Sequence, residues 1–136
     1  MAGNTRVPLV VFSPKSMLRH RLSQSSLGEL TSGTSFQPVL QDDEVAQDLD
    51  AVQRVVMCSG KIYWELLEAR RAASVDGLAS PPVAFVRVEQ LYPFPAAAVR
   101  DALARYGNAD ELVWCQEEPR NRATAPLRKL TAIICH

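Results

Sequence analysis

The stretch of residues 83–121 constrains the fold more than any other part of the chain. It opens with an apolar, β-branched run at residues 83–88 and closes with a second apolar run at residues 112–115. Between them, a pattern beginning at Pro95 repeats apolar residues at helical spacing and stops at a glycine suited to a left-handed cap (Val99, Ala102, Leu103, Tyr106, Gly107). Neither run alternates with polar residues, as is typical of parallel strands covered on both faces. The stretch predicts a strand, a helix and a second strand of a parallel sheet.

A second unit of the same kind precedes this stretch. Residues 54–58 predict a strand, Ser59 and Gly60 predict a turn, and a helix is expected from about Lys61 onward. One face of this helix is expected to be apolar (Ile62, Leu66, Ala69, Ala73). Two arginines near its expected end suit the negative pole of the helix dipole (Arg70, Arg71).

The first fifty residues predict a further strand and helix and an edge strand. Residues 7–12 are apolar, and Ser13 can cap a helix that starts at the following proline and has an apolar side (Met17, Leu18, Leu22). Residues 36–40 predict an edge strand, because Pro38 donates no ladder hydrogen bond. Residues 41–50 hold five acidic residues and predict a solvated loop. Alternating strands and helices indicate an α/β fold with three layers and a mostly parallel, open sheet.

Length and composition exclude several classes of protein. At 136 residues the chain is one ordinary domain. Fifteen basic and fifteen acidic residues cancel, so bulk charge gives no reason to expect a nucleic acid or a membrane as partner. No apolar run approaches the roughly 20 residues that span a bilayer, and a signal-peptide pattern is absent, so we expect a cytoplasmic protein. His20 and His136 are too far apart to predict a metal site, and Cys58 and Cys115 are expected in the core.

Lys61 is the most informative candidate for binding. It stands at the positive end of its predicted helix, where a lysine is unfavourable unless an anion shares the free backbone amides. The sequence CSGK after a strand therefore predicts an anion or phosphate site. It is not a Walker loop, because that motif requires glycine where Val55 stands and Ser or Thr where Ile62 stands. The alternative is a solvated lysine that pairs with a nearby carboxylate such as Glu65.

Four other residues are of types that can take part in catalysis (Glu117, Glu118, Cys115, His20). Glu117 and Glu118 suggest acid–base chemistry, but neighbours in an extended segment face opposite sides, which favours structural roles. Cys115 as a nucleophile needs a nearby base that the sequence does not place. His20, which lies between two arginines on a short predicted helix, is expected at the surface.

Arg87 and Glu89 interrupt the end of the apolar run at residues 83–88. Polar groups at the carboxyl end of a parallel strand often face a ligand or subunit crevice. The alternative is an ion pair that closes the following turn. Both interpretations are open at the level of sequence.

Four motifs in a fixed order point to one family. They are SPKSMLRHRL, CSGKIYWELL, RVEQLYPFP and VWCQEEPRN. Together they closely resemble the C-terminal domain of the thiamine-diphosphate-dependent, decarboxylating component of 2-oxoglutarate dehydrogenase. The resemblance covers about residues 7–121. Ser13 is a conservative departure from it, since the family usually has threonine at that place.

The resemblance implies a fold, partners and a role that differs from that of the cofactor-binding domains. In that family this region is a transketolase-like α/β domain that helps to build the homodimer. The complete enzyme decarboxylates 2-oxoglutarate and passes the succinyl group to the lipoyl arm of the succinyltransferase component. Preceding domains hold thiamine diphosphate and magnesium, and their Gly-Asp-Gly signature does not occur in this sequence. This chain alone is therefore expected to hold no cofactor and to be catalytically silent.

The resemblance also implies an effector site, because acetyl-CoA binds at this domain as an activator in some relatives of the actinobacterial type. Four residues are candidate ligands for its phosphates (Lys61, Arg54, Thr34, Ser35). We therefore expect a domain for dimerisation or regulation. Two alternatives stay open: a free-standing module that binds anions or CoA-type nucleotides through Lys61, and a small enzyme that uses Cys115 with Glu117 or Glu118.

The resemblance ends abruptly after residue 121. There the family continues with Gln-Gly-Ala-Trp, whereas this chain continues with RATAP and ends in LRKLTAIICH. The pattern predicts a 2-oxoglutarate dehydrogenase C-terminal-type domain at residues 1–121, a divergent tail at residues 122–136 and a sheet truncated at its C-terminal end. A frameshift or a gene fragment is our hypothesis for the change. If the last strand is missing, the unpaired edge predicts marginal stability or aggregation.

Overall fold

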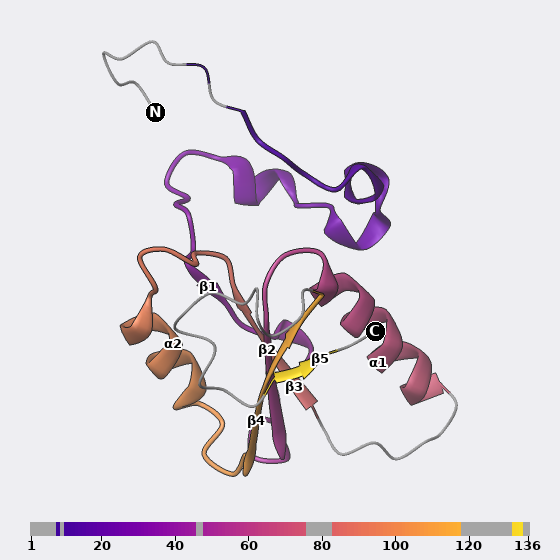
Figure 1. Ribbon diagram of the computed structural model, residues 1–136, viewed down its shortest axis with the longest axis vertical. Helices are drawn as coiled ribbons and strands as arrows, with labels where there is room; N and C mark the ends of the chain where they lie inside the picture. Colours follow the sequence, from indigo (N-terminus) through magenta and orange to yellow (C-terminus); the bar gives the residue numbers. More distant parts are fainter. Residues whose placement is uncertain (1–7, 9, 46–47, 76–82, 118–131, 135–136) are drawn as a thin grey trace.

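Three parallel strands form the centre of the sheet: β2 (Arg54–Cys58), β3 (Val83–Val88) and β4 (Glu111–Gln116). The order across the sheet is β1-β3-β2-β4-β5, with β1 (Val39–Leu40) antiparallel to β3 and β5 (Ala132–Ile134) parallel to β4. The computed structural model describes Pro8 and residues 10–45, 48–75, 83–117 and 132–134 (Figure 1). The predicted α/β class and mostly parallel sheet are confirmed.

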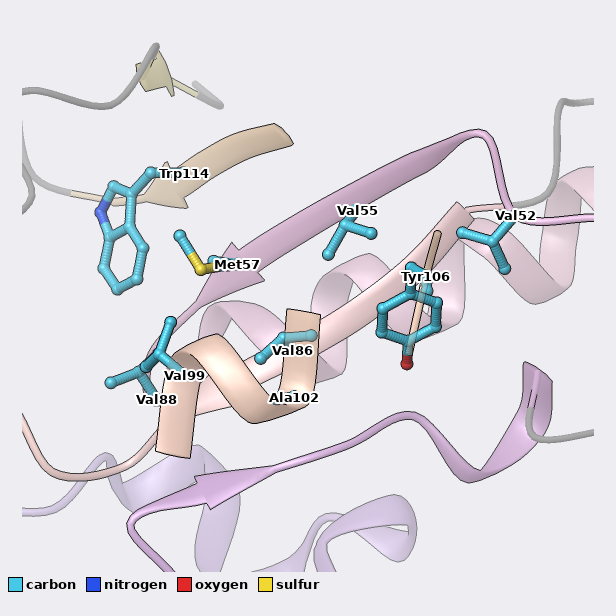
Figure 2. Close-up of a cluster of buried hydrophobic side chains, with 10 residues drawn as sticks. Val52, Val55, Met57, Val86, Val88, Val99, Ala102, Tyr106 and Trp114 are labelled. Carbon is cyan, nitrogen blue, oxygen red and sulfur yellow. The ribbon is translucent and has the colours of Figure 1, made fainter. Parts of the chain in front are cut away.

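The sheet lies between two helices, as Figure 1 shows: α1 (Ile62–Val75) and α2 (Ala96–Leu103). Side chains alternate along each strand, so Val56 and Cys58 of β2 pack with Ile62 on one face. Val55 and Met57 pack on the other face with residues of α2 and with Tyr106 and Trp114 (Figure 2). The predicted three layers are confirmed, because two separate apolar cores cover the two faces of one sheet. Cys58 and Cys115 are both core residues, as predicted.

The first described residues form no strand and no α-helix, which corrects the predicted N-terminal unit. Residues 10–12 are extended and exposed, and three short 3-10 helices follow them: η1 (Lys15–Arg19), η2 (Arg21–Ser23) and η3 (Leu27–Leu30). Ser13 caps nothing, since Pro14 is the residue that precedes η1 and it makes no side-chain cap. Leu18 is exposed, and Met17 and Leu22 are half-buried but belong to neither of the two apolar cores. A short helix without tertiary packing does not recover the cost of nucleation.

Both helices end differently from the prediction. Helix α2 closes on Ala104 in right-handed conformation, and positive φ occurs among the described residues only at Gly33 and Gly60, so Gly107 is no left-handed cap. Helix α1 runs on to Val75, beyond Arg70 and Arg71, which pair with acidic side chains instead of the helix end. Its buried face also differs, because Leu67 is buried whereas Ala69 is exposed. The turn at Ser59 and Gly60 is confirmed, and its φ of 71° suits glycine.

Residues 36–45 differ from the predicted strand and loop in the length of the strand and in the burial of Asp42. The edge strand is confined to Val39 and Leu40. Beyond it, a side chain takes over the pairing with β3, because Asp42 Oδ2 accepts a 2.9 Å hydrogen bond from the backbone N–H of Phe85. Asp42 is therefore buried rather than solvated, and a short 3-10 helix, η4 (Asp43–Val45), follows it. A carboxylate that finds an arginine and backbone donors can be buried at little cost, and the sequence does not reveal such partners.

Strand β5 occupies the edge of the sheet that was expected to be missing its last strand. Its residues 132–134 come from the tail and pair in parallel with Trp114, Cys115 and Gln116 of β4. The sheet thus continues beyond β4, and the expected unpaired edge at β4 is wrong, because β5 pairs with it. The boundary at residue 121 stays a prediction.

Candidate functional site

The carboxyl ends of β2 and β3 define the candidate site. β2 leads into α1 on one face of the sheet and β3 leads into α2 on the other, so the two connections diverge between neighbouring strands. In open α/β sheets, ligands bind in the crevice at such a switch point. Charged residues follow all three central strands here: Lys61 and Glu65 after β2, Arg87 and Glu89 at the end of β3, and Glu117 after β4. We call these five residues the carboxyl-edge cluster.

Lys61 is held by two carboxylates of this cluster. Its Nζ lies 2.6 Å from Glu117 Oε1 and 3.1 Å from Glu65 Oε1. Hydrogen bonds with Glu117 and Glu65 raise the pKa of Lys61 above its ordinary value, so the ammonium stays charged at neutral pH. The predicted pairing of Lys61 with Glu65 is confirmed. Anion binding by Lys61 stays a prediction, and an anion would have to compete with these carboxylates.

Arg87 lies on an aromatic shelf formed by the first turn of α1. Its guanidinium carbon is 4.4 Å from the centre of the Tyr63 ring and 5.2 Å from that of Trp64. Its Nε donates a 3.0 Å hydrogen bond to Glu89 Oε1, which confirms the ion-pair interpretation. A guanidinium fixed by ring faces and one carboxylate is pre-organised to meet a planar or anionic group.

Two adjoining cavities lie between Arg87 and the N-terminal segment. The larger is about 640 Å³ and includes two of the predicted ligands (Ser25, Glu29, Gly33, Thr34, Ser35, Phe36, Gln37, Leu40, Arg87, Glu89). The smaller is about 370 Å³ and reaches the aromatic shelf (Ser23, Gln24, Ser25, Glu29, Leu40, Gln41, Asp43, Tyr63, Trp64, Arg87). Arg87 and Glu89 were predicted to face a ligand or subunit crevice, and both line the larger cavity. What this cavity binds stays a prediction.

The four predicted effector ligands do not form one cluster. Arg54 is the first residue of β2, and Lys61 comes three residues after the last, so the length of the strand, roughly 13 Å at about 3.3 Å per residue, separates them. Arg54 instead pairs with Glu111 at 2.6 Å, beside the amino ends of the strands. Thr34 and Ser35 share a cavity with Arg87 and Glu89 rather than with Lys61. Their role in effector binding remains a prediction.

The four candidate catalytic residues do not form one site. Cys115 is 2% exposed, and its neighbour Cys58 has a pKa raised to about 12, mainly by burial. Glu117 pairs with Lys61, and Glu118 lies outside the described residues. His20 is half-buried rather than at the surface, with Nε2 3.2 Å from Glu68 Oε1 and its ring near Trp64. Cys135 and His136 also lie outside the described residues.

Sequence reasoning missed Tyr63 and Trp64, the aromatic shelf. A signal was present, because two adjacent aromatic residues in the first turn of a helix that follows a parallel strand must lie near the carboxyl edge of the sheet. Their partner Arg87 comes from another strand, so the sequence alone did not indicate that the rings would carry a guanidinium.

Within the described ranges, no three His, Cys, Asp or Glu side chains are grouped so as to hold a metal ion. Among the helices that the structure describes, none is both long and apolar enough to cross a membrane.

Comparisons with known proteins agree with the resemblance seen in the motifs. The family described as 2-oxoglutarate dehydrogenase C-terminal matches residues 24–126. The 2-oxoglutarate dehydrogenase E1 component of Haemophilus influenzae is 51% identical over 117 residues, which is 86% of this chain and 12% of that protein. The E1 components of Rickettsia conorii and Brucella anthropi are 45% and 44% identical, over 89% of this chain and 12% of each relative.

The comparisons cover most of this chain but only a small part of each relative. This chain spans 12% of the length of these relatives, whereas the family match takes in the sheet from β1 to β4, both helices and the carboxyl-edge cluster. The match therefore concerns this one domain. The chain belongs to the 2-oxoglutarate dehydrogenase C-terminal family.

Proposed function

We infer that this chain serves as the C-terminal domain of a 2-oxoglutarate dehydrogenase E1 component, in assembly or regulation rather than in the chemical step. The observation that carries this proposal is the family match over residues 24–126, which includes the whole carboxyl-edge cluster. The pairing of its charges supports the same view, because Lys61 and Arg87 each already have a carboxylate partner, and the thiols of Cys58 and Cys115 are buried in the core.

The family suggests the surroundings in which such a domain works. We expect the parent enzyme to be cytoplasmic and to decarboxylate 2-oxoglutarate with thiamine diphosphate and magnesium held outside this chain. We expect its partners to be a second E1 subunit, as a homodimer, and the succinyltransferase component. The isolated chain is expected to have no decarboxylase activity.

A domain exchange tests this proposal. The matched C-terminal region of the Haemophilus influenzae relative would be replaced by this chain, and decarboxylation of 2-oxoglutarate by the purified chimera would be measured. Activity in the chimera, with none after the same region is deleted, is the expected result. A soluble chimera that is as inactive as the deletion would overturn the proposal.

The alternative function is an effector module for CoA-type nucleotides at the carboxyl-edge cluster. The geometry favours Lys61 as the phosphate ligand, because it stands at the positive end of α1 beside Gly60. A phosphate there must displace Glu117, so removal of that carboxylate is expected to help binding.

Three variants test the alternative by calorimetric titration with acetyl-CoA. Lys61→Ala is expected to weaken binding by about tenfold or more, the loss of one charged hydrogen bond. Glu117→Gln is expected to strengthen it. Arg54→Ala is the matched control, since Arg54 lies at the other end of β2, and it should change nothing. Equal affinity in Lys61→Ala and the unchanged chain would refute the effector site.

A further inference from the structure

The N-terminal segment exposes large apolar side chains to an unusual degree. Phe12 is 95% exposed, Leu27 84% and Leu30 72%, and four more residues of the segment are exposed in the same way (Val10, Val11, Leu18, Phe36). We call residues 10–36 the apolar segment. Single exposed apolar residues are ordinary, but seven within one short stretch indicate a surface that another polypeptide covers.

The backbone of the segment arranges these side chains for contact. Leu27 and Leu30 are the first and last residues of η3, and residues three apart in a 3-10 helix lie one above the other. The two leucines therefore form one exposed ridge. In Figure 1 the segment lies off the end of the sheet where α1 begins, and its first residues extend away from the domain. The described core therefore leaves the seven apolar side chains of the segment uncovered.

Basic residues accompany the apolar ones. Lys15, Arg19 and Arg21 are exposed on η1 and η2, and Glu29 is the one acidic residue between residues 10 and 36. A complementary partner would present an apolar surface with an acidic margin.

The place of the segment in the family identifies the partner. The family match begins at residue 24, inside the apolar segment. The family is described as C-terminal, and this chain spans only 12% of the relatives' length, so in the relatives a long part of the polypeptide lies ahead of the counterpart of this segment. A junction of this kind is the part of a domain that the neighbouring domain is placed to cover.

We propose that the apolar segment is the docking surface for the part of the E1 polypeptide that precedes this domain in the relatives. The inference rests on the proposed function and adds to it a named contact surface. The same segment lines both cavities beside Arg87, through Ser25 and Glu29. Docking would therefore also fix one wall of the candidate site.

Hydrogen exchange tests the proposal in the chimera described above. Amide exchange in residues 10–36 would be compared between the chimera and the isolated chain. We expect the segment to exchange at least about tenfold more slowly in the chimera, because docking suppresses local opening. A triple variant, Phe12→Ser with Leu27→Gln and Leu30→Gln, should remove this protection. Tyr92→Gln is the matched control, since Tyr92 is as exposed but lies outside the segment.

The outcomes separate the two proposals. Equal exchange in chimera and isolated chain overturns docking, even if the chimera is active and the proposed function stands. Protection in an inactive chimera supports docking and counts against the proposed function. Protection that grows with the concentration of the isolated chain identifies a second copy as the occupant and overturns the proposal. Loss of folding in the isolated triple variant also overturns it, because the side chains would then belong to this domain's own core.

Discussion

Two clusters of ion pairs lie along helix α1 and differ mainly in burial. At its start, Lys61 is held by Glu117 and Glu65, and the lysine side chain is 31% exposed. In its second half, Arg70 is held by Asp42 and Glu44, with the arginine 17% exposed and the Asp42 side chain fully buried. Each cluster places one cation between two carboxylates. Composition therefore does not distinguish them.

The buried cluster also binds the backbone, and this decides its role. Asp42 accepts the N–H groups of Phe85 and Glu44, while Arg70 donates to the Val83 carbonyl at 3.0 Å and lies over the Phe85 ring. It thus ties β3 to α1 and to the turn after β1. The Lys61 cluster is more exposed, with Glu65 57% and Glu117 44% exposed, so its carboxylates can be exchanged for a ligand at small cost.

Asp42→Ala should have the largest effect. The substitution leaves the Phe85 N–H without its acceptor and Arg70 with one carboxylate fewer, so we expect a loss of about 3–5 kcal/mol in the free energy of unfolding. Urea denaturation followed by circular dichroism measures it. Glu65→Ala is the control at the exposed cluster and should leave the unfolding midpoint nearly unchanged. Equal losses in the two variants would remove the distinction between the clusters.

Double-mutant cycles sharpen the comparison with a smaller effect. The coupling between Asp42 and Arg70 is expected to be about 2 kcal/mol, since contacting groups in one buried network are not additive. The coupling between Lys61 and Glu117 is expected to be close to zero, because both side chains are exposed to solvent. Unfolding free energies of the single and double alanine variants give both values. A stronger coupling in the exposed pair would reverse our interpretation.

The pH dependence of Glu44 gives the smallest effect. Partial burial acts to raise the pKa of Glu44, but hydrogen bonds from Arg71 and Arg70 outweigh it and lower the pKa below its ordinary value near 4.5. The folded state therefore gains stability above that pH and loses it as the pH falls through the lowered pKa. Because the side chain is more than a third exposed, the gain should stay below about 1 kcal/mol.

Glu44→Gln measures this contribution. The variant should be slightly less stable than the unchanged chain at pH 7, and the difference should vanish in acid. Asp43→Asn, at an exposed neighbouring position, serves as the control. A difference that is constant with pH would show that the Glu44 carboxylate does not act through its charge.

Much of the sheet was predictable because its central strands carry the information locally. Val55 to Cys58 and Val83 to Val86 are continuous apolar runs, and such runs are typical of strands that are buried on both faces. The apolar run at residues 10–12 looked similar and forms no strand, since no neighbouring strand pairs with it. A run of apolar residues thus predicts a strand only where the tertiary structure supplies a partner.

The candidate site was predictable in part. Lys61 was recognised because it stands at the start of a predicted helix that follows a strand, and Arg87 and Glu89 because they lie at the carboxyl end of another predicted strand. Arg54 was grouped with Lys61 from its charge alone, although β2 separates the two. The grouping of charges depends on which end of a strand each one occupies.

The sequence by itself determined the family, the α/β class, the central strands and the residues at their carboxyl ends, because motif order and hydrophobic runs are local properties of the chain. Only the tertiary structure decided which charges are buried. Asp42 lies in an acidic run and Lys61 at the start of a predicted helix, and both were expected to be solvated or to face a ligand. Yet Asp42 is enclosed by Arg70 and the Phe85 N–H, whereas Lys61 remains half-exposed. Burial depends on partners from distant segments, and these meet only when the sheet and helices pack together.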